Sequence, residues 1–415
     1  MSSPLPELVI PFRGDRYRDT ARLGRLIAPP YDVIAANERA RYAAEAHNIV
    51  HVMLPEAPSG GDRYAWAAAE LARWRAEGVL ARDARPSVYV VAQEFSLPSG
   101  ERRTRRGFFG AVAAESYDTR RVRPHERTHA GPKADRLALL QATKTNLESI
   151  FLIAPDADGT LDAALAAATR AAPDATAELD GVRIALWVVS GNALSRIPIP
   201  QAPLYIADGH HRYETAATHA ADGGDGRVLG LIVSARDPGL AVLPTHRVLL
   251  APGRDVGKLT QEWRRWFDVE PAGTMGDRAA RLAERGKDHT AFWLALSGGD
   301  ELVLTLRRDA SLDQVPELGR TPSVRSLDVS IAEALVIGPI VRAGSATVTL
   351  GYTPDAENAV ERVRQRKATA AVLLNPTRVE QVIAVADAGD VMPPKSTYFI
   401  PKVPSGVVVR AEGAA

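Results

Sequence analysis

The sequence predicts a mixed α/β protein, in an α/β or α+β arrangement. Short runs rich in apolar and β-branched residues alternate along the chain with segments that follow the helical period. The apolar fraction of 46% and the charged fraction of 24% are typical of a folded globular chain. Because 415 residues exceed the usual size of one domain, we expect two closely packed lobes, residues 1–250 and 251–415, with a seam near Pro252-Gly253.

The first lobe begins with a predicted helix and a pair of strands. Residues 62–78 carry apolar side chains at the helical period, and Gly78 suits the end of a helix. The segment PSVYVVAQEFSLPSGERRTRRGFFGAVAAESY predicts two strands joined by a turn at Ser99-Gly100. Helices near 160–171 and 211–222 then alternate with β-rich runs, which indicates a mixed sheet with helices packed on it. These runs are FLIAPD, VRIALWVVS, PLYIADG and RVLGLIVSA.

The second lobe has the same alternation. We expect a helix near 257–267, then a hairpin in FWLALSGGDELVLTL, and helices at 355–366 and 377–386 with a strand AVLLN between them. Since no repeat of 20 to 50 residues and no low-complexity linker occurs, the two lobes are expected to pack closely.

Charge and residue types argue against several classes of protein. Lys and Arg number 51 against 50 Asp and Glu, a net charge of +1, so we expect neither nucleic acid nor a membrane as partner. The absence of Cys removes disulfides, Cys-ligated metals and thiol nucleophiles. No signal-type start and no run of about 18 apolar residues occurs, so we expect a cytoplasmic protein whose oligomeric state stays open. For Arg102, Arg103, Arg105 and Arg106 we favour a solvated strand edge over an anion site.

The segment ADGHHRYETA places five polar groups at a strand-to-helix junction. PLYI predicts a strand, and a helix is expected from His211 onward, so Gly209 and His210 fall at the helix start. Backbone N–H groups there have no helical partner and attract anions. Gly209 would let a phosphate approach, while His210 and Arg212 would donate to it. Asp208 could take a proton from a substrate hydroxyl or hold Mg²⁺.

A structural interpretation fits the same residues equally well. Asp208 could cap the helix, with the histidines satisfying buried carbonyls. A zinc site is the least favoured interpretation, because His210 and His211 are adjacent and cannot face one metal from a helix.

The HERTH segment at 125–129 matches the metallopeptidase pattern H-E-x-x-H. That pattern needs a long helix with both histidines on one face, whereas Gly131-Pro132 follows almost at once. We therefore favour a pocket lining over zinc, followed by a helix at 135–141 that offers an arginine to an anion. The pocket candidates here are His125, Glu126 and Arg136.

Two further segments carry second-tier candidates for a substrate pocket. LPTHRVLL at 243–250 predicts a strand with His246 at its start, where a structural role is favoured. The proline-rich segment MPPKSTYFIPK contains Lys395 and either covers a site or closes the fold. The phosphate loop of common NTPases, a strand-placed G-x-G-x-x-G and the serine-hydrolase elbow are absent from the sequence.

Five separated segments closely resemble the bacterial and archaeal family called domain of unknown function 1015. They are APPYDVI, PHERTHAGPKADRLALLQATKTN, YIADGHHRYETA, LPTHR and MPPKSTYFIPK, and the resemblance extends from about residue 8 to about residue 409. The family brings no established activity with it.

The D-G-H-x-R core also resembles the phosphate-binding loop of the ParB and sulfiredoxin superfamily, which includes free-serine kinases. This resemblance implies a ParB/sulfiredoxin-like core around residues 120–250, elaborated by a second lobe. It implies that Asp208 is the catalytic acid or base, that Gly209 is the close-approach residue, and that His210 and Arg212 bind phosphate. His211 takes the place of sulfiredoxin's reactive cysteine, so sulfiredoxin chemistry is excluded, and we count His211 among the second-tier candidates for a substrate pocket.

From these residues and the resemblance we expect a kinase: phosphoryl transfer from ATP or ADP, with Mg²⁺, to the hydroxyl of a small metabolite such as serine. Asp208 and Glu126 are the predicted catalytic and metal-binding carboxylates. The alternative is a non-catalytic switch of the ParB-like superfamily that binds CTP or ATP. A metallopeptidase built on HERTH is a third possibility.

Overall fold

The computed structural model describes residues 6–128, 130–201, 203–251, 255–272, 278–318, 321–343 and 347–414. The chain forms two compact units. Unit 1 comprises residues 1–241 and 401–415, and unit 2 comprises residues 242–400. Unit 2 is therefore an insertion, and the last residues of the chain return to unit 1. The predicted lobes differ from these units in two places, since 242–250 belongs to unit 2 and 401–415 to unit 1.

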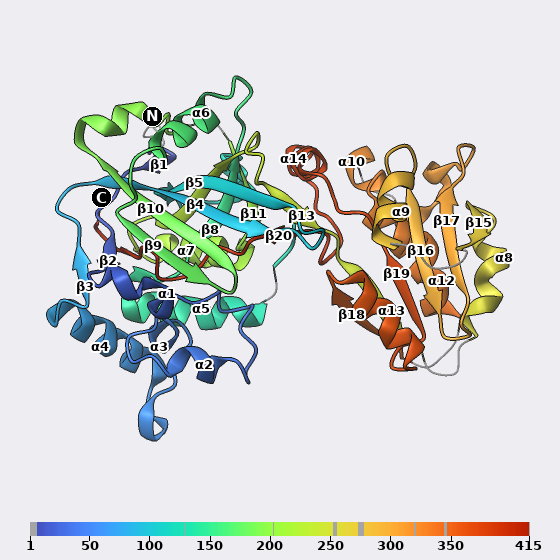
Figure 1. Ribbon diagram of the computed structural model, residues 1–415, viewed down its shortest axis with the longest axis horizontal. Coiled ribbons are helices and arrows are strands. Elements are labelled where there is room, and N and C mark those ends of the chain that lie inside the picture. Colours follow the sequence, from blue (N-terminus) through green and yellow to red (C-terminus); the bar gives the residue numbers. More distant parts are fainter. Residues whose placement is uncertain are drawn as a thin grey trace. The chain divides into compact units, whose positions relative to one another are not determined.

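Unit 1 is built on a mixed sheet, in which the described residues form nine strands (Figure 1). The strand order is β6-β11-β8-β12-β5-β4-β10-β9, and β1 also pairs with β5. The pairs β6 with β11 and β8 with β12 are parallel, and the other pairs are antiparallel. The strands are β1 (Val9–Ile10), β4 (Ser87–Ser96), β5 (Arg102–Ala113), β6 (Val122–Arg123), β8 (Ile150–Ala154), β9 (Ala175–Leu179), β10 (Val182–Ser190), β11 (Leu204–Asp208) and β12 (Arg227–Ser234).

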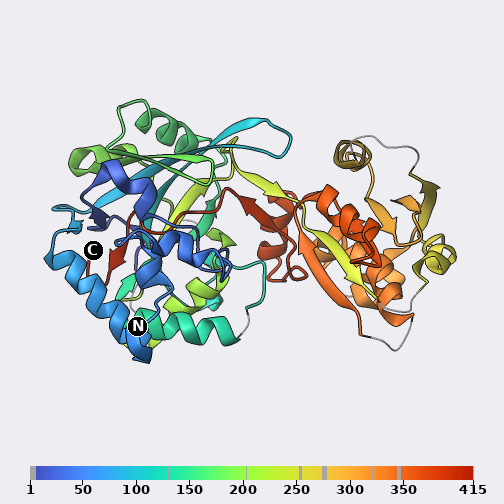
Figure 2. The ribbon, with the colours of Figure 1, turned by 60° about the horizontal axis from the view of Figure 1, so that its bottom comes forward.

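The helices of unit 1 begin and end at sequence signals. In α4 (Arg63–Ala76) the Asp62 carboxylate accepts from two backbone N–H groups of the first turn, and Gly78 follows with φ of 73°. This helix packs on α5 (Ala130–Thr143), and α5 packs on α7 (His210–Ala221). Both views place α4 and α5 on one side of unit 1 and α6 (Thr160–Ala168) on the other (Figures 1 and 2).

Shorter elements complete unit 1. They are β2 (Asp15–Tyr17), β3 (Leu80–Arg82), β7 (Thr145–Asn146), β21 (Arg410–Ala411), α1 (Leu23–Leu26), α2 (Arg39–Ala43) and α3 (Val50–Met53). The pairing of β21 with β7 fastens the end of the chain into unit 1. Lys402 is thereby held among elements that precede residue 242.

Two predictions for unit 1 were wrong in detail. The helix expected at 135–141 begins at Ala130, because Pro132 falls in its first turn, where a missing N–H removes no helical hydrogen bond. Arg105 does not belong to a solvated edge, since its side chain is 1% exposed. Its guanidinium donates to Gln93 and to the Pro401 carbonyl and lies over the Phe151 ring.

Unit 2 has its own antiparallel sheet, six-stranded in the described residues, in the order β15-β17-β16-β19-β14-β18. The predicted hairpin corresponds to β16 and β17. The helix expected at 257–267 is shorter: a 3-10 turn (Val256–Leu259) leads into α8 (Thr260–Trp263), and Phe267 pairs with Leu306 in the sheet.

The strands of unit 2 are β14 (His246–Leu250), β15 (Phe267–Pro271), β16 (Ala291–Leu296), β17 (Glu301–Leu306), β18 (Thr349–Thr353) and β19 (Ala370–Leu373). Its helices include α9 (Arg278–Arg285), α10 (Pro322–Arg325), α11 (Asp328–Ile331), α12 (Gly338–Arg342), α13 (Ala356–Arg364) and α14 (Val379–Asp387), with a π-helix (Ala332–Ile337) between α11 and α12. The short strands β13 (Ala241–Leu243) and β20 (Tyr398–Ile400) lie where the chain changes units.

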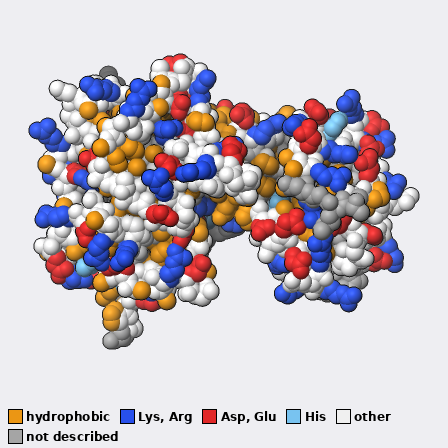
Figure 3. All heavy atoms as spheres, viewed as in Figure 1, with side chains coloured by type: hydrophobic (Ala, Val, Ile, Leu, Met, Phe, Trp, Pro, Cys, Tyr) orange, Lys and Arg blue, Asp and Glu red, His pale blue; other side chains and the backbone are white. Residues whose placement is uncertain are grey.

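The predicted mixed α/β class with a second lobe is confirmed by these sheets and helices. On the face drawn in Figure 3, acidic and basic side chains are interspersed, which agrees with the net charge of +1. Within the described ranges, no helix combines the length and apolar character that a bilayer crossing requires.

Candidate functional site

The turn from β11 into α7 brings the DGHHR residues together in unit 1. Gly209 is the residue before the helix and has φ of 93°, a left-handed conformation that glycine adopts without strain. A Cβ at this position would lie 3.2 Å from the guanidinium carbon of Arg212 and 3.1 Å from Ile150. Gly209 is thus the N-cap residue, and it has no side chain with which to cap the helix. The Asp208 cap considered for this helix is therefore not formed.

Asp208 is instead held between two cations. One carboxylate oxygen accepts from Lys402 Nζ at 2.7 Å and the other from Arg212 Nη2 at 2.8 Å. Burial alone would raise the pKa of Asp208, but Lys402 and Arg212 outweigh burial and hold that pKa well below its usual range. Asp208 is therefore a firmly ionised carboxylate and a poor proton acceptor.

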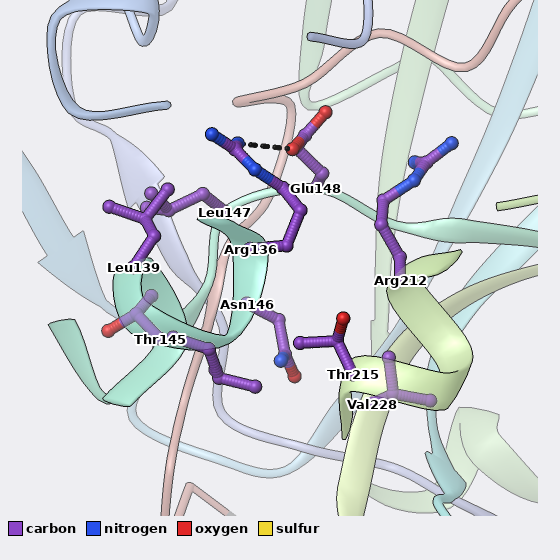
Figure 4. Close-up of a pocket in the computed structure, with 10 residues that line it drawn as sticks. Arg136, Leu139, Thr145, Asn146, Leu147, Glu148, Arg212, Thr215 and Val228 are labelled. Atoms are coloured by element: carbon purple, nitrogen blue, oxygen red, sulfur yellow. Dashed lines mark hydrogen bonds and ion pairs between the residues drawn. The ribbon is translucent and has the colours of Figure 1, made fainter. Parts of the chain in front are cut away.

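Lys402, Asp208 and Arg212 form a triad. Arg212 connects this triad to a second buried carboxylate, that of Glu148. Its guanidinium also donates to the Ser149 carbonyl, and its side chain is 8% exposed. Burial would lower the pKa of Arg212, but Glu148 and Asp208 raise it. Figure 4 shows the Glu148 carboxylate between Arg212 and Arg136.

Glu148 accepts from Arg136 at 3.4 Å and from the Tyr31 backbone N–H at 2.9 Å. Arg136 is anchored by Asp135 and the Met53 carbonyl, and its guanidinium lies 4.4 Å from the centre of the Tyr31 ring. Burial raises the pKa of Glu148, although the two arginines oppose that effect. Glu148 is thus a better proton acceptor than Asp208.

His125 and His210 pack against each other. Their rings meet edge to face with centroids 4.7 Å apart, and the His125 backbone N–H donates to His210 Nε2. His125 Nδ1 lies 2.8 Å from the Ile206 carbonyl, so this nitrogen carries the proton. Burial lowers the pKa of His125 to about 4 and also lowers that of His210, so both rings are neutral near pH 7. His211, the next residue, is half-buried.

The HERTH segment precedes α5 and is not helical over residues 125–128, and His129 lies outside the described residues. Thr128 and Lys133 both donate to Glu214 of α7, at 2.6 and 2.8 Å. These contacts hold the segment that carries Glu126 against α7. Glu126 is half-buried and lies next to His125 in the chain.

The other two predicted residues, His246 and Lys395, belong to unit 2. His246 Nδ1 accepts from the Leu374 backbone N–H at 3.2 Å. Burial lowers the pKa of His246 to about 4. The Lys395 carbonyl accepts from Arg247, and Lys395 has φ of 56°.

Two cavities adjoin the triad. The first, of about 50 Å³, lies among α5, α7 and the segment after β7, and both Arg212 and Glu148 line it (Figure 4). The Thr215 hydroxyl points toward it and has no hydrogen-bond partner among the described residues. The second, of about 170 Å³, is mostly apolar and is lined by Lys402. Each cavity thus meets one of the two cations that hold Asp208.

Magnesium at Asp208 and Glu126 stays a prediction, and the surroundings of Asp208 do not favour it. Among the described residues, no group of three His, Asp or Glu side chains could hold a metal ion. Both oxygens of Asp208 already bind cations, which repel a divalent ion. Positive charge at this turn comes from Lys402 and Arg212.

Sequence reasoning missed Lys402 and Glu148. Lys402 lies in the same proline-rich segment as Lys395, which was chosen instead. Glu148 was detectable as an acid between the apolar residues Leu147 and Ile150, a position where a charge needs a partner.

The family described as "Protein of unknown function (DUF1015)" matches residues 9–330. The chain belongs to this DUF1015 family. Most of unit 1 and the first half of unit 2 lie within the matched range. The predicted membership is therefore confirmed, and no curated protein matches the chain.

Solved structures resemble this DUF1015 chain weakly. A conserved hypothetical protein from Pyrococcus furiosus is 14% identical with a TM-score of 0.36, covering 72% of this chain and 93% of its own. A free serine kinase in complex with AMP is 14% identical with a TM-score of 0.37, covering 72% and 92%. Truncated SbnI from Staphylococcus aureus is 12% identical with a TM-score of 0.34, covering 74% and 84%.

Proposed function

We propose that this DUF1015 protein transfers a phosphoryl group from ATP or ADP to the hydroxyl of a small metabolite, such as serine or a related amino acid. The observation that carries the proposal is the triad Lys402–Asp208–Arg212 at the start of α7. Two cations meet one carboxylate at the start of a helix, where the helix dipole favours an anion, and that arrangement suits a chain of phosphates.

In this proposal each residue of the turn has a separate task. Gly209 leaves room for a phosphate beside the backbone, and the N–H groups of the first turn of α7 bind its oxygens. Lys402 and Arg212 stabilise the charge that develops on the transferred group. Asp208 holds both cations in place, which replaces the acid–base role predicted from the sequence. His210, being neutral, contributes a hydrogen bond and no charge.

The bond changes are those of an in-line displacement. The acceptor hydroxyl oxygen forms a bond to the terminal phosphorus, the bond from that phosphorus to the bridging oxygen breaks, and the nucleotide leaves with the electron pair. The hydroxyl proton passes to a carboxylate, for which we propose Glu148, because its pKa is raised by burial. Glu126 is the second candidate for this step.

The direct test is product formation from labelled ATP or ADP with a panel of hydroxy amino acids. Wild-type protein should form a phosphorylated product, and Glu148→Gln should reduce the rate about 100-fold while nucleotide affinity changes little. Asp208→Asn should reduce the rate too, because Lys402 and Arg212 lose their common partner. A wild-type protein that binds nucleotide without forming product contradicts the transferase.

A second function, a nucleotide-binding switch, is favoured by one observation. The charge of Asp208 is balanced by two cations, so the carboxylate nearest the turn binds them and is a poor proton acceptor. In that case CTP or ATP binding would alter how the protein engages a partner. Nucleotide binding that changes proteolysis or hydrogen exchange, with no turnover for any acceptor, would identify the switch.

A further inference from the structure

The mostly apolar cavity lined by Lys402 is the strongest unassigned feature of unit 1. It encloses about 170 Å³ between the β9–β10 hairpin, the APPYDVI segment and the returning C-terminal segment. Its apolar walls come from Pro29, Val33, Leu179, Val182, Ile184 and Pro404. The APPYDVI segment, which the proposed transfer reaction leaves without a task, therefore meets the segment that carries Lys402 here.

Lys402 connects this cavity to the phosphate turn. Its side chain lines the cavity, and its Nζ donates to Asp208, the residue before Gly209. A ligand in the cavity thus lies one lysine side chain away from the start of α7. This connection suits a molecule that packs a ring in the cavity while its phosphates reach the turn.

The walls match the flat, rigid, apolar face of an aromatic ring. Proline rings are fixed in φ and lose little freedom when a ligand packs on them, so the cavity is preorganised. The polar side chains in the lining already have protein partners. Gln93 donates to the Lys402 carbonyl and accepts from Arg105, while Asp180 accepts from Arg41 and Tyr42.

We propose that this cavity binds the base of the nucleotide, with the phosphates leading past Lys402 to the Gly209 turn. The inference rests on the proposed function, because it requires a nucleotide at that turn. Since Gln93 and Asp180 are engaged with the protein, the cavity offers packing surface and little recognition of base edges. We therefore expect ADP, GDP, CDP and UDP to bind with affinities within about tenfold of one another.

Val33 allows a test that leaves the core intact, because it lies at the cavity and is 39% exposed. Val33→Trp should fill the cavity and weaken ADP and ATP binding about tenfold or more, measured by calorimetry. Inorganic tripolyphosphate, which has no base, should bind this variant and wild type within about twofold. The matched control is Val341→Trp in unit 2, where the valine is 47% exposed, and it should change neither affinity.

Each outcome is informative. If wild type binds nucleotide and Val33→Trp binds it equally well, the base lies elsewhere and the inference is wrong while the proposed function stands. If Val33→Trp weakens tripolyphosphate as much as ADP, the substitution acts on the phosphate turn and the base assignment is also wrong. If wild type binds no nucleotide, the proposed function fails and the inference with it. Leu179→Trp, on the hairpin wall, should reproduce the expected result independently.

Discussion

A His–Arg cluster lies just after β11 in unit 1 and at the start of β14 in unit 2, and the two clusters have different partners. In unit 1, Arg212 shares the carboxylate of Asp208 with Lys402, beside a helix start and two cavities. In unit 2, Arg247 is fully buried and donates to three backbone carbonyls and to Glu333. The first arrangement gathers cations around one acid, whereas the second saturates one cation with backbone oxygens.

The partners of an arginine distinguish a binding site from a purely structural cluster more reliably than the residue types do. Backbone carbonyls that accept from Arg247 cannot be exchanged for a ligand without leaving buried polar groups unpaired. A phosphate at the turn of α7, by contrast, can accept hydrogen bonds that Arg212 and Lys402 now donate to Asp208. The comparison therefore predicts that substitutions in unit 1 alter binding and rate, whereas those in unit 2 alter stability.

The largest expected effect is that of Lys402→Met. The variant removes one of the two charges that face the transferred phosphoryl group, so kcat/KM should fall about 1000-fold. The measurement is the initial rate of product formation from labelled ATP or ADP. Lys258→Met, at a side chain that is 82% exposed, serves as the control and should leave the rate unchanged. Equal rates for Lys402→Met and wild type would remove the main support for the proposed function.

Lys402 also marks the limit of what the sequence predicts. Helices and strands with clear periodicity, such as α4, β4, β5 and α7, were predicted because their signals are local. The turn at Gly209 was predicted for the same reason. The partner of Asp208 lies 194 residues away and depends on the return of the chain into unit 1, which no local pattern encodes.

Arg105 was predicted wrongly for a related reason. Its alternation with Phe109 along β5 places both side chains on one face, and that face is buried. The four neighbouring arginines predicted a solvated strand edge instead, because their charge was given more weight than the two-residue period of a strand. Burial of a guanidinium depends on distant acceptors, here Gln93 and the Pro401 carbonyl.

Arg247→Met tests the structural role that the comparison assigns to Arg247 in unit 2. The substitution leaves Glu333 and several buried carbonyls without their donor, so the free energy of unfolding should fall by about 3 kcal/mol. Urea denaturation followed by tryptophan fluorescence measures this loss. Arg308→Met, at an exposed position, should change stability by less than about 0.5 kcal/mol. ADP affinity should be the same in both variants, and a weaker affinity in Arg247→Met would contradict the division between the units.

His125 and His246 test whether the two clusters respond alike to pH. Burial lowers the pKa of each to about 4, so the unfolded chain binds more protons than the folded chain between about pH 6.5 and 4. Stability contributed by each neutral ring is complete above about pH 6.5 and is lost as the pH falls toward 4. The loss reaches about 3 kcal/mol for each histidine.

Glutamine can donate as His125 does and accept as His246 does, and it cannot titrate. His125→Gln and His246→Gln should each flatten the fall in the free energy of unfolding between pH 6.5 and 4, relative to wild type. Comparing denaturation curves at several pH values gives this slope directly. A slope that is unchanged in His125→Gln would show that the pKa of this ring is not lowered in the folded protein, and the neutral state assigned to it would be wrong.

The smallest expected effect is that of Gly209→Ala, and it tests the backbone of the turn. With φ of 93°, an alanine here costs about 1–2 kcal/mol in stability. Its Cβ would also lie 3.2 Å from Arg212, so the guanidinium must shift and ADP affinity should fall several-fold. Gly298→Ala, where a Cβ meets no atom within 4 Å, should change neither quantity. If Gly209→Ala loses stability but binds ADP normally, the glycine serves the fold alone, and the turn of α7 becomes a structural corner like that of Arg247.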